Sequence, residues 1–197
     1  MVSVFDGDRS MLDHGENVIV TPLGSNNCHN FGPVSARDSI VHTCARPGGD
    51  NTNEGRNKIP TSEAVSEWIQ FMTDPERNIR HVIILLSKEE LEAYDDPGLI
   101  AAYQSGGITV HHIPYNSEKS YVKIMSELEK IEQEGNGNVT AHCTHGMGRS
   151  GRVAAGWLVH RYGLTIEDAV EETLAMARKA GVERMGSPRQ LAEWISG

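Results

Sequence analysis

The stretch His142–Gly151, which reads HCTHGMGRSG, decides the fold that the sequence predicts. Val139–His142 is expected to form a short β-strand, and residues 150–162 have the pattern of an α-helix. Gly146 and Gly148 permit the positive φ angles that a tight turn needs. We therefore expect a strand, a loop and a helix in succession. The loop should lie at the carboxyl end of the strand, where α/β proteins bind their ligands.

The side chains of this loop suit it to hold a phosphate group and to attack it. Cys143 comes just before a helix start, whose partial positive charge favours an ionised thiol and also binds anions. Arg149 offers a planar fork of N–H donors that matches phosphate oxygens, and Ser150 can hydrogen-bond the sulfur. His142 can orient the loop or add positive charge. The residues predicted to bind phosphate are Thr144, His145, Gly146, Met147, Gly148 and Arg149.

Outward from the loop, strands and helices alternate along most of the chain. Apolar runs predict strands at 81–86 and 108–113, and helical spacing of apolar residues predicts a strong helix at 120–134. Ser87 and Glu90 form a capping box that opens another helix. Further helices are expected at 61–71, 165–180 and 188–195. This order predicts an α/β fold with a central, mostly parallel, twisted sheet flanked by helices.

The length of 197 residues suits one domain, which we assign to residues 1–197. The predicted core is 80–195, with the phosphate loop at 142–151. Residues 1–60 are expected to be largely irregular, because glycine, asparagine, proline and serine are frequent there. Short strands are expected in that region near 18–20 and 40–41.

Composition limits the classes of partner and compartment. The chain has 18 Lys and Arg residues against 27 Asp and Glu residues, a formal net charge of −9, which disfavours nucleic acids and anionic membranes. Three cysteines favour a reducing compartment over a disulfide framework. Acidic residues near the N-terminus interrupt any signal peptide there, and the apolar run Val82–Leu86 is too short to cross a bilayer. We expect a cytoplasmic protein.

No metal ion or other cofactor is expected. The histidines that invite a metal interpretation are His42, His111, His112, His142 and His145. Their spacing fits no closed zinc site, and the adjacent pair at 111–112 points to opposite faces of a strand.

The loop pattern resembles the signature of the protein tyrosine phosphatase superfamily, a histidine and a cysteine followed after five residues by Arg-Ser-Gly. Residues 85–108 and 111–114 resemble compact dual-specificity phosphatases of the kinase-associated type. The resemblance implies a cysteine-phosphatase fold and hydrolysis of phosphate monoesters through a phosphocysteine intermediate. The implied substrates are phosphorylated proteins, carrying phosphotyrosine and also phosphoserine or phosphothreonine, or small phosphate esters.

The resemblance also assigns roles to individual residues. It makes Cys143 the nucleophile, Arg149 the phosphate clamp and Ser150 a hydrogen-bond donor to the departing sulfur. Gln190 matches a position near the pocket at which relatives position water, and an ordinary polar helix residue fits that position equally well.

The sequence departs from the family pattern at the general acid. The family places an aspartate in the loop after the strand at 108–113, and the corresponding residue here is Ser117. Glu118 is the nearest carboxyl group and the first candidate acid, although it equally suits a solvated first turn of the next helix. Asp95 and Asp96 are the next candidates, with a solvated turn as the simpler interpretation.

Two alternative functions remain open at this point. The run His142–Gly146 is also similar to the loop of cysteine-type RNA 5′-triphosphatases, which cleave a phosphoanhydride whose leaving group needs less protonation. Gly148 replaces the asparagine usual in that group, and the negative net charge opposes RNA binding. The other alternative is a phosphate-binding pseudophosphatase that has the loop without an efficient acid.

Overall fold

The computed structural model describes residues 18–20, 28–49 and 60–197. The elements in chain order are β1 Val18–Val20, the 3₁₀ turn η2 Cys28–Asn30, β2 Gly32–Pro33, β3 Val41–Ala45, α1 Ser62–Thr73, β4 Ile79–Ile84, α2 Lys88–Leu91, α3 Leu99–Ser105, β5 Thr109–His112, α4 Ser120–Glu134, β6 Asn138–Cys143, α5 Gly148–Tyr162, α6 Ile166–Ala180, β7 Arg184–Gly186 and α7 Pro188–Ser196. No helix among these described segments is long and apolar enough to span a membrane.

The central sheet has five strands in the order β2-β3-β6-β4-β5. The three pairs among β3, β6, β4 and β5 are parallel, and only the β2–β3 pair is antiparallel. β1 and β7 form a separate antiparallel pair. The predicted α/β class with a mostly parallel sheet is confirmed, and the strand that leads to the phosphate loop lies in the middle of this sheet.

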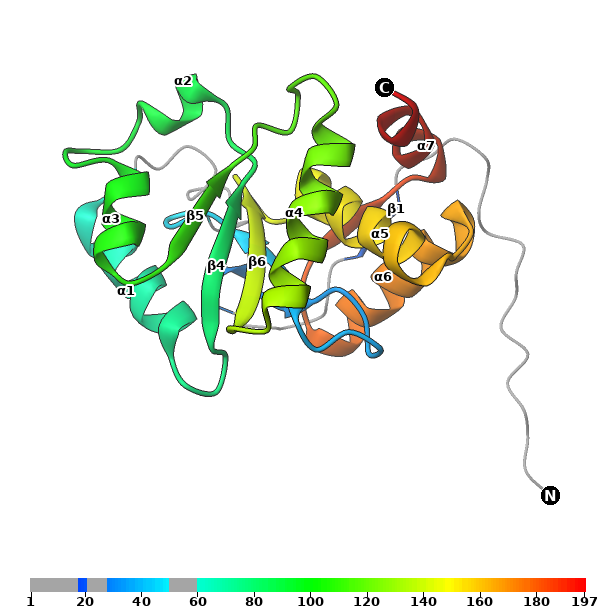
Figure 1. Cartoon of the computed structure of the whole chain (residues 1–197), viewed down its shortest axis with the longest axis horizontal. Helices are drawn as coiled ribbons and strands as arrows, with labels where there is room; N and C mark the ends of the chain where they lie inside the picture. Colours follow the sequence, from blue (N-terminus) through cyan, green and yellow to red (C-terminus); the bar gives the residue numbers. More distant parts are fainter. Residues whose placement is uncertain (1–17, 21–27, 50–59) are drawn as a thin grey trace.

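Helices cover both faces of the sheet (Figure 1). Because successive strand residues face opposite sides, Ile83 and Leu85 join a core with α4, α5, α6 and α7, whereas Val82, Ile84 and Leu86 join a second core with α1 and α3. This two-sided burial explains why residues 82–86 form an uninterrupted apolar run.

The structure differs from the predicted elements at two places that matter for the site. β3, in the region expected to be largely irregular, runs from Val41 to Ala45 and pairs with the whole length of β6 from Val139 onward. In addition, α5 begins at Gly148 rather than at residue 150. Arg149 and Ser150 therefore belong to the first helical turn, which fixes their backbone.

Candidate active site

Cys143 is the last residue of β6, and its side chain is enclosed by protein. Only 3% of the residue is exposed, and Ser150 is fully buried beside it. The Ser150 hydroxyl oxygen lies 3.1 Å from the Cys143 sulfur and 3.2 Å from the Cys44 carbonyl oxygen. Since a hydroxyl has one proton, it donates to one of these acceptors at a time. The sulfur thus has a hydrogen-bond donor fixed on the first turn of α5.

Glycine is required at two positions where β3 and the loop approach each other. Gly146 has a φ of 73°, and a methyl group there would lie 2.6 Å from backbone atoms of Cys44 and Ala45. A methyl group on Gly49 would lie 2.0 Å from the Thr144 carbonyl oxygen. The Arg46 amide donates to the Cys143 carbonyl oxygen at 2.8 Å. Backbone packing against the end of β3 therefore sets the shape of the loop.

Arg149 is held by a carboxylate that the sequence analysis assigned only to a helix cap. Its Nη1 and Nη2 donate to the two Glu90 carboxylate oxygens, each at 2.7 Å, and Nη2 also donates to Thr144 Oγ1 at 2.7 Å. Thr144 in turn donates to Glu90 Oε1 at 2.9 Å. The guanidinium orientation is thus fixed by a forked ion pair.

Glu90 is ionised throughout the working range of pH. Burial alone raises the pKa of Glu90, but hydrogen bonds from Arg149, the Ser87 backbone and Thr144 lower it to about 2. The same carboxylate closes the predicted capping box, because Ser87 N donates to Glu90 Oε2 at 2.8 Å. Glu90 therefore positions Arg149 and cannot act as a general acid.

His142 lies behind the loop and carries no charge at neutral pH. It is fully buried, and its Nε2 lies 3.1 Å from the Tyr103 hydroxyl oxygen. Burial, together with the nearby charges of Arg46 and Arg149, lowers the pKa of His142 to about 3. Of the two roles expected for this residue, adding positive charge is excluded by this pKa, and orienting the loop is the one that remains.

We expect acid to destabilise the fold through His142. Its pKa is lower in the folded state than the ordinary value of 6.5, so the unfolded chain binds the extra proton between these values. Below pH 6.5 the free energy of unfolding should then fall, by up to about 1.4 kcal/mol per pH unit, until the pH approaches 3. Denaturant unfolding at several pH values measures this slope.

His142→Asn should reduce that slope, since the titrating imidazole is gone. Tyr103→Phe is the matched control, because it removes the hydrogen-bond partner and keeps the imidazole. An equal pH slope in His142→Asn and the parent would contradict the assignment.

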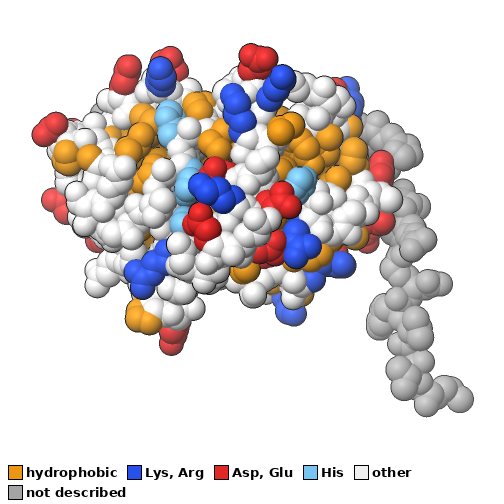
Figure 2. All heavy atoms as spheres, viewed as in Figure 1, with side chains coloured by type: hydrophobic (Ala, Val, Ile, Leu, Met, Phe, Trp, Pro, Cys, Tyr) orange, Lys and Arg blue, Asp and Glu red, His pale blue; other side chains and the backbone are white. Residues whose placement is uncertain are grey.

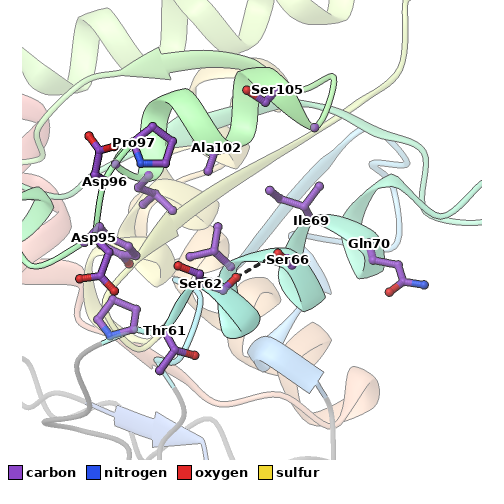
Figure 3. A pocket seen from close by; sticks show the side chains of 16 residues that line it. Thr61, Ser62, Ser66, Ile69, Gln70, Asp95, Asp96, Pro97, Ala102 and Ser105 are labelled. Atoms are coloured by element: carbon purple, nitrogen blue, oxygen red, sulfur yellow. Dashed lines mark hydrogen bonds between the residues drawn. The ribbon is translucent and has the colours of Figure 1, made fainter.

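The candidate acids do not converge on Cys143. Glu118 is exposed in the connection between β5 and α4. Asp95 and Asp96 line a cavity of about 450 Å³ between α1 and α3, together with apolar residues such as Ile69 and Pro97 (Figure 3). The connection that carries Glu118 nevertheless begins close to the loop, since Tyr115 N and Arg149 Nη1 both donate to the Leu85 carbonyl oxygen, at 3.1 Å and 3.4 Å.

Gln190 lies at the start of α7, facing the first turn of α5. Its side-chain oxygen accepts a hydrogen bond from Arg152 Nη1, and the Arg152 guanidinium lies over the Tyr115 ring, 5.1 Å from its centre. Arg152 was not predictable from the sequence, because a single arginine within a helix carries no motif. Within the described ranges, no group of three or more His, Cys, Asp or Glu residues is arranged to hold a metal ion.

Comparison with known proteins adds sequence evidence to this geometry. Cyclin-dependent kinase inhibitor 3 of Rattus norvegicus is 31% identical over 145 residues, covering 71% of this chain and 59% of that protein. Its counterpart from Sus scrofa is 36% identical over 122 residues, covering 59% and 53%. These matches span only about half to three fifths of the length of the curated relatives.

Solved structures share the fold. Kinase associated phosphatase, crystallised with its catalytic-site cysteine replaced by serine, superposes with a TM-score of 0.62 at 21% identity, over 88% of this chain and 93% of that one. Tk-PTP in its active form gives 0.58 at 21% identity, over 85% and 94%. The family model described as "Dual specificity phosphatase, catalytic domain" matches residues 74–196, which include β4, the phosphate loop and α7. The chain therefore belongs to the dual specificity phosphatase family.

Proposed function

We propose that this protein hydrolyses phosphate monoesters through a phosphocysteine intermediate on Cys143. The observation that carries the proposal is the place of the Cys143 sulfur at the β6–α5 junction, with the Ser150 hydroxyl 3.1 Å away. Phosphate binding alone needs neither a nucleophile nor a donor aimed at it. The two hydrogen bonds between Arg149 and Glu90 fix the guanidinium before substrate binds, which further supports a loop that is preorganised for a phosphoryl group.

In the first step, the thiolate of Cys143 attacks phosphorus and forms a sulfur–phosphorus bond. The bond from phosphorus to the ester oxygen breaks, and its electron pair leaves on that oxygen, which takes a proton from an acid or from water. Arg149 and the backbone N–H groups of residues 144–149 stabilise the charge on the phosphoryl oxygens. Among these residues, Gly146 and Gly148 keep the loop surface free of side chains.

In the second step, a water oxygen attacks phosphorus and the sulfur–phosphorus bond breaks. The electron pair returns to the Cys143 sulfur, and the Ser150 hydroxyl stabilises the thiolate by donating to it. Inorganic phosphate leaves. The proton of the attacking water passes to solvent or to the conjugate base of the acid that protonated the leaving group in the first step. Gln190 is the candidate for positioning this water, and its hydrogen bond with Arg152 holds it at the start of α7.

We infer phosphorylated proteins as the substrates, with phosphotyrosine first and phosphoserine or phosphothreonine as further targets. The relatives named for cyclin-dependent kinases and for kinase association support a protein substrate. On the face seen in Figure 2, basic side chains alternate with acidic ones and form no broad basic patch, which disfavours nucleic acid there. A reducing cytoplasm suits the free thiol of Cys143, and a single domain over residues 1–197 remains our proposal.

A phosphate-release screen tests the function directly. The arms are a phosphotyrosine peptide, a phosphothreonine peptide, a water-soluble phosphoinositide and triphosphate-ended RNA. We expect the phosphotyrosine peptide to be the best substrate, and acid quench during turnover to trap phosphate on Cys143. Faster release from the RNA would favour the triphosphatase alternative, and phosphate binding without release from any arm would favour a pseudophosphatase.

The missing aspartate leads to a prediction about leaving groups. We expect rates to fall steeply as the leaving-group pKa rises, because an oxygen that departs without a proton keeps negative charge. If Glu118 supplies that proton, Glu118→Gln should slow alkyl phosphates by about 10²–10⁴-fold and spare nitrophenyl phosphate. Steady-state rates over a series of esters measure this dependence.

Asp95→Asn and Asp96→Asn are the matched controls, since both carboxylates line the separate cavity beside α3. They should behave like the parent on every ester. Parental rates for Glu118→Gln on alkyl phosphates would remove Glu118 from the mechanism.

A further inference from the structure

Arg152 lies one helical turn after Arg149 on α5 and turns its guanidinium toward the phosphate loop. A methyl group placed on Gly148 would lie 3.8 Å from Arg152 Nη2. Nη1 donates to the Gln190 side-chain oxygen, and the guanidinium carbon lies 5.1 Å from the centre of the Tyr115 ring. Arg152 thus sits between the loop, the start of α7 and the β5–α4 connection.

The β5–α4 connection also begins close to Arg149, because both share one hydrogen-bond acceptor. The Leu85 carbonyl oxygen accepts from both Tyr115 N and Arg149 Nη1. Burial raises the pKa of Tyr115, and the positive charges of Arg152 and Arg149 act against that rise. A substrate whose phosphate is held by Arg149 would therefore carry its neighbouring groups past Tyr115 and Arg152.

The charge of Arg152 has no carboxylate partner among the residues that the structure describes. Arg149 is paired with Glu90 and Arg161 with Glu132, but in the described part of the chain no carboxylate forms an ion pair with Arg152. Its Nε is buried and has no hydrogen-bond partner there. A partly buried guanidinium with a donor left over is unfavourable unless an anion binds to it.

We propose that Arg152, with Tyr115 and Gln190, forms a second anion subsite that selects phosphopeptides bearing another negative charge next to the phosphorylated residue. This rests on the proposed function, because it concerns substrates that Cys143 dephosphorylates. Arg152 Nη2, which lies on the side of Gly148, supplies the donor for a carboxylate or a second phosphate, and the Tyr115 ring holds the guanidinium in place.

A peptide fits this subsite better than a membrane lipid does. Tyr115 stacks on Trp194 with ring centres 4.9 Å apart, so that two adjacent aromatic rings extend from Arg152 along α7. Aromatic side chains and arginine are enriched together at protein–protein interfaces. The net charge of −9 also repels an anionic bilayer surface.

The test compares phosphotyrosine peptides that differ only in one neighbour of the phosphotyrosine, glutamate or glutamine, placed before or after it. For the parent protein we expect kcat/KM to be about tenfold higher with glutamate on one side. Arg152→Met should bring that ratio close to one, and Arg152→Lys should give an intermediate ratio, because lysine keeps the charge and loses the fork. The ratio cancels any loss common to both peptides.

Arg178→Met is the control, since it removes one positive charge from an exposed position on α6. It should leave the ratio at the parental value. The proposal is overturned if the parent turns over both peptides equally, if Arg152→Met keeps the preference, or if Arg178→Met loses it as well. Absence of any turnover would instead refute the proposed function. An Arg152-dependent gain on inositol bisphosphate over monophosphate, without one on peptides, would overturn the peptide assignment.

Discussion

Replacing Cys143 with serine should abolish phosphate release, with kcat falling by about 10⁴-fold or more, the scale expected when a nucleophile is lost. A serine hydroxyl is protonated at neutral pH, and the Ser150 hydroxyl beside this position donates a hydrogen bond instead of accepting the proton. The phosphate-binding groups stay in place, so a phosphopeptide should still bind.

The measurement pairs single-turnover kinetics with calorimetric binding of the same phosphopeptide. Cys28→Ser is the matched control, because Cys28 is a free cysteine whose side chain is exposed. It should retain parental activity. Appreciable turnover by Cys143→Ser would remove Cys143 from the chemistry, and a loss of binding equal to the loss of turnover would show that the substitution damages the loop itself.

The chemistry of the loop was predictable because the residues that carry it are consecutive in the sequence. His142–Gly151 combines a strand end, two glycines and a helix start, so one local pattern places the sulfur, Arg149 and Ser150 together. The sheet was predictable for a similar reason, because residues 82–86 are an apolar run that two-sided burial explains. Local periodicity and local spacing determine both features.

The partners of the loop were not predictable, because they are distant in sequence. Glu90 precedes Arg149 by 59 residues, and the capping box at Ser87 already accounted for its presence. β3 has a short apolar pattern that could end anywhere near residue 41, and only its pairing with β6 shows that it continues to Ala45 and packs on the loop. Nothing local distinguishes such long-range contacts from an ordinary surface residue or turn.

The positions of the candidate acids in the fold were also not predictable from local sequence. From the sequence, Glu118 is the first candidate acid and Asp95 and Asp96 are the next, although all three are carboxylates near a turn. The structure separates them, because the two aspartates line the cavity between α1 and α3 (Figure 3), whereas the connection carrying Glu118 starts beside Arg149. Residue type therefore identifies candidate acids, and only the fold shows where each of them lies.

Replacing Arg149 with lysine should lower kcat/KM by about 10²–10³-fold, the scale of losing a preorganised charge-stabilising donor. The guanidinium binds Glu90 with two parallel hydrogen bonds, and it also donates to Thr144 Oγ1 and to the Leu85 carbonyl oxygen, so its direction is fixed. An ammonium group is a point charge that cannot hold the Glu90 fork and a phosphoryl group in fixed directions at once. Without that fixed direction, Glu90 competes with the substrate for the remaining positive charge.

Arg161→Lys is the matched control, because it makes the same exchange at an exposed arginine of the same helix, whose Nε donates to both carboxylate oxygens of Glu132 on α4. It should leave kcat/KM close to the parental value. Glu90→Gln should lower activity by a smaller factor than Arg149→Lys, since it frees the guanidinium without removing it. The double variant should then lose less than the product of the two single losses, because both changes disrupt one pair. Parental turnover in Arg149→Lys, with thermal unfolding unchanged, would show that the guanidinium does not contact the phosphoryl group.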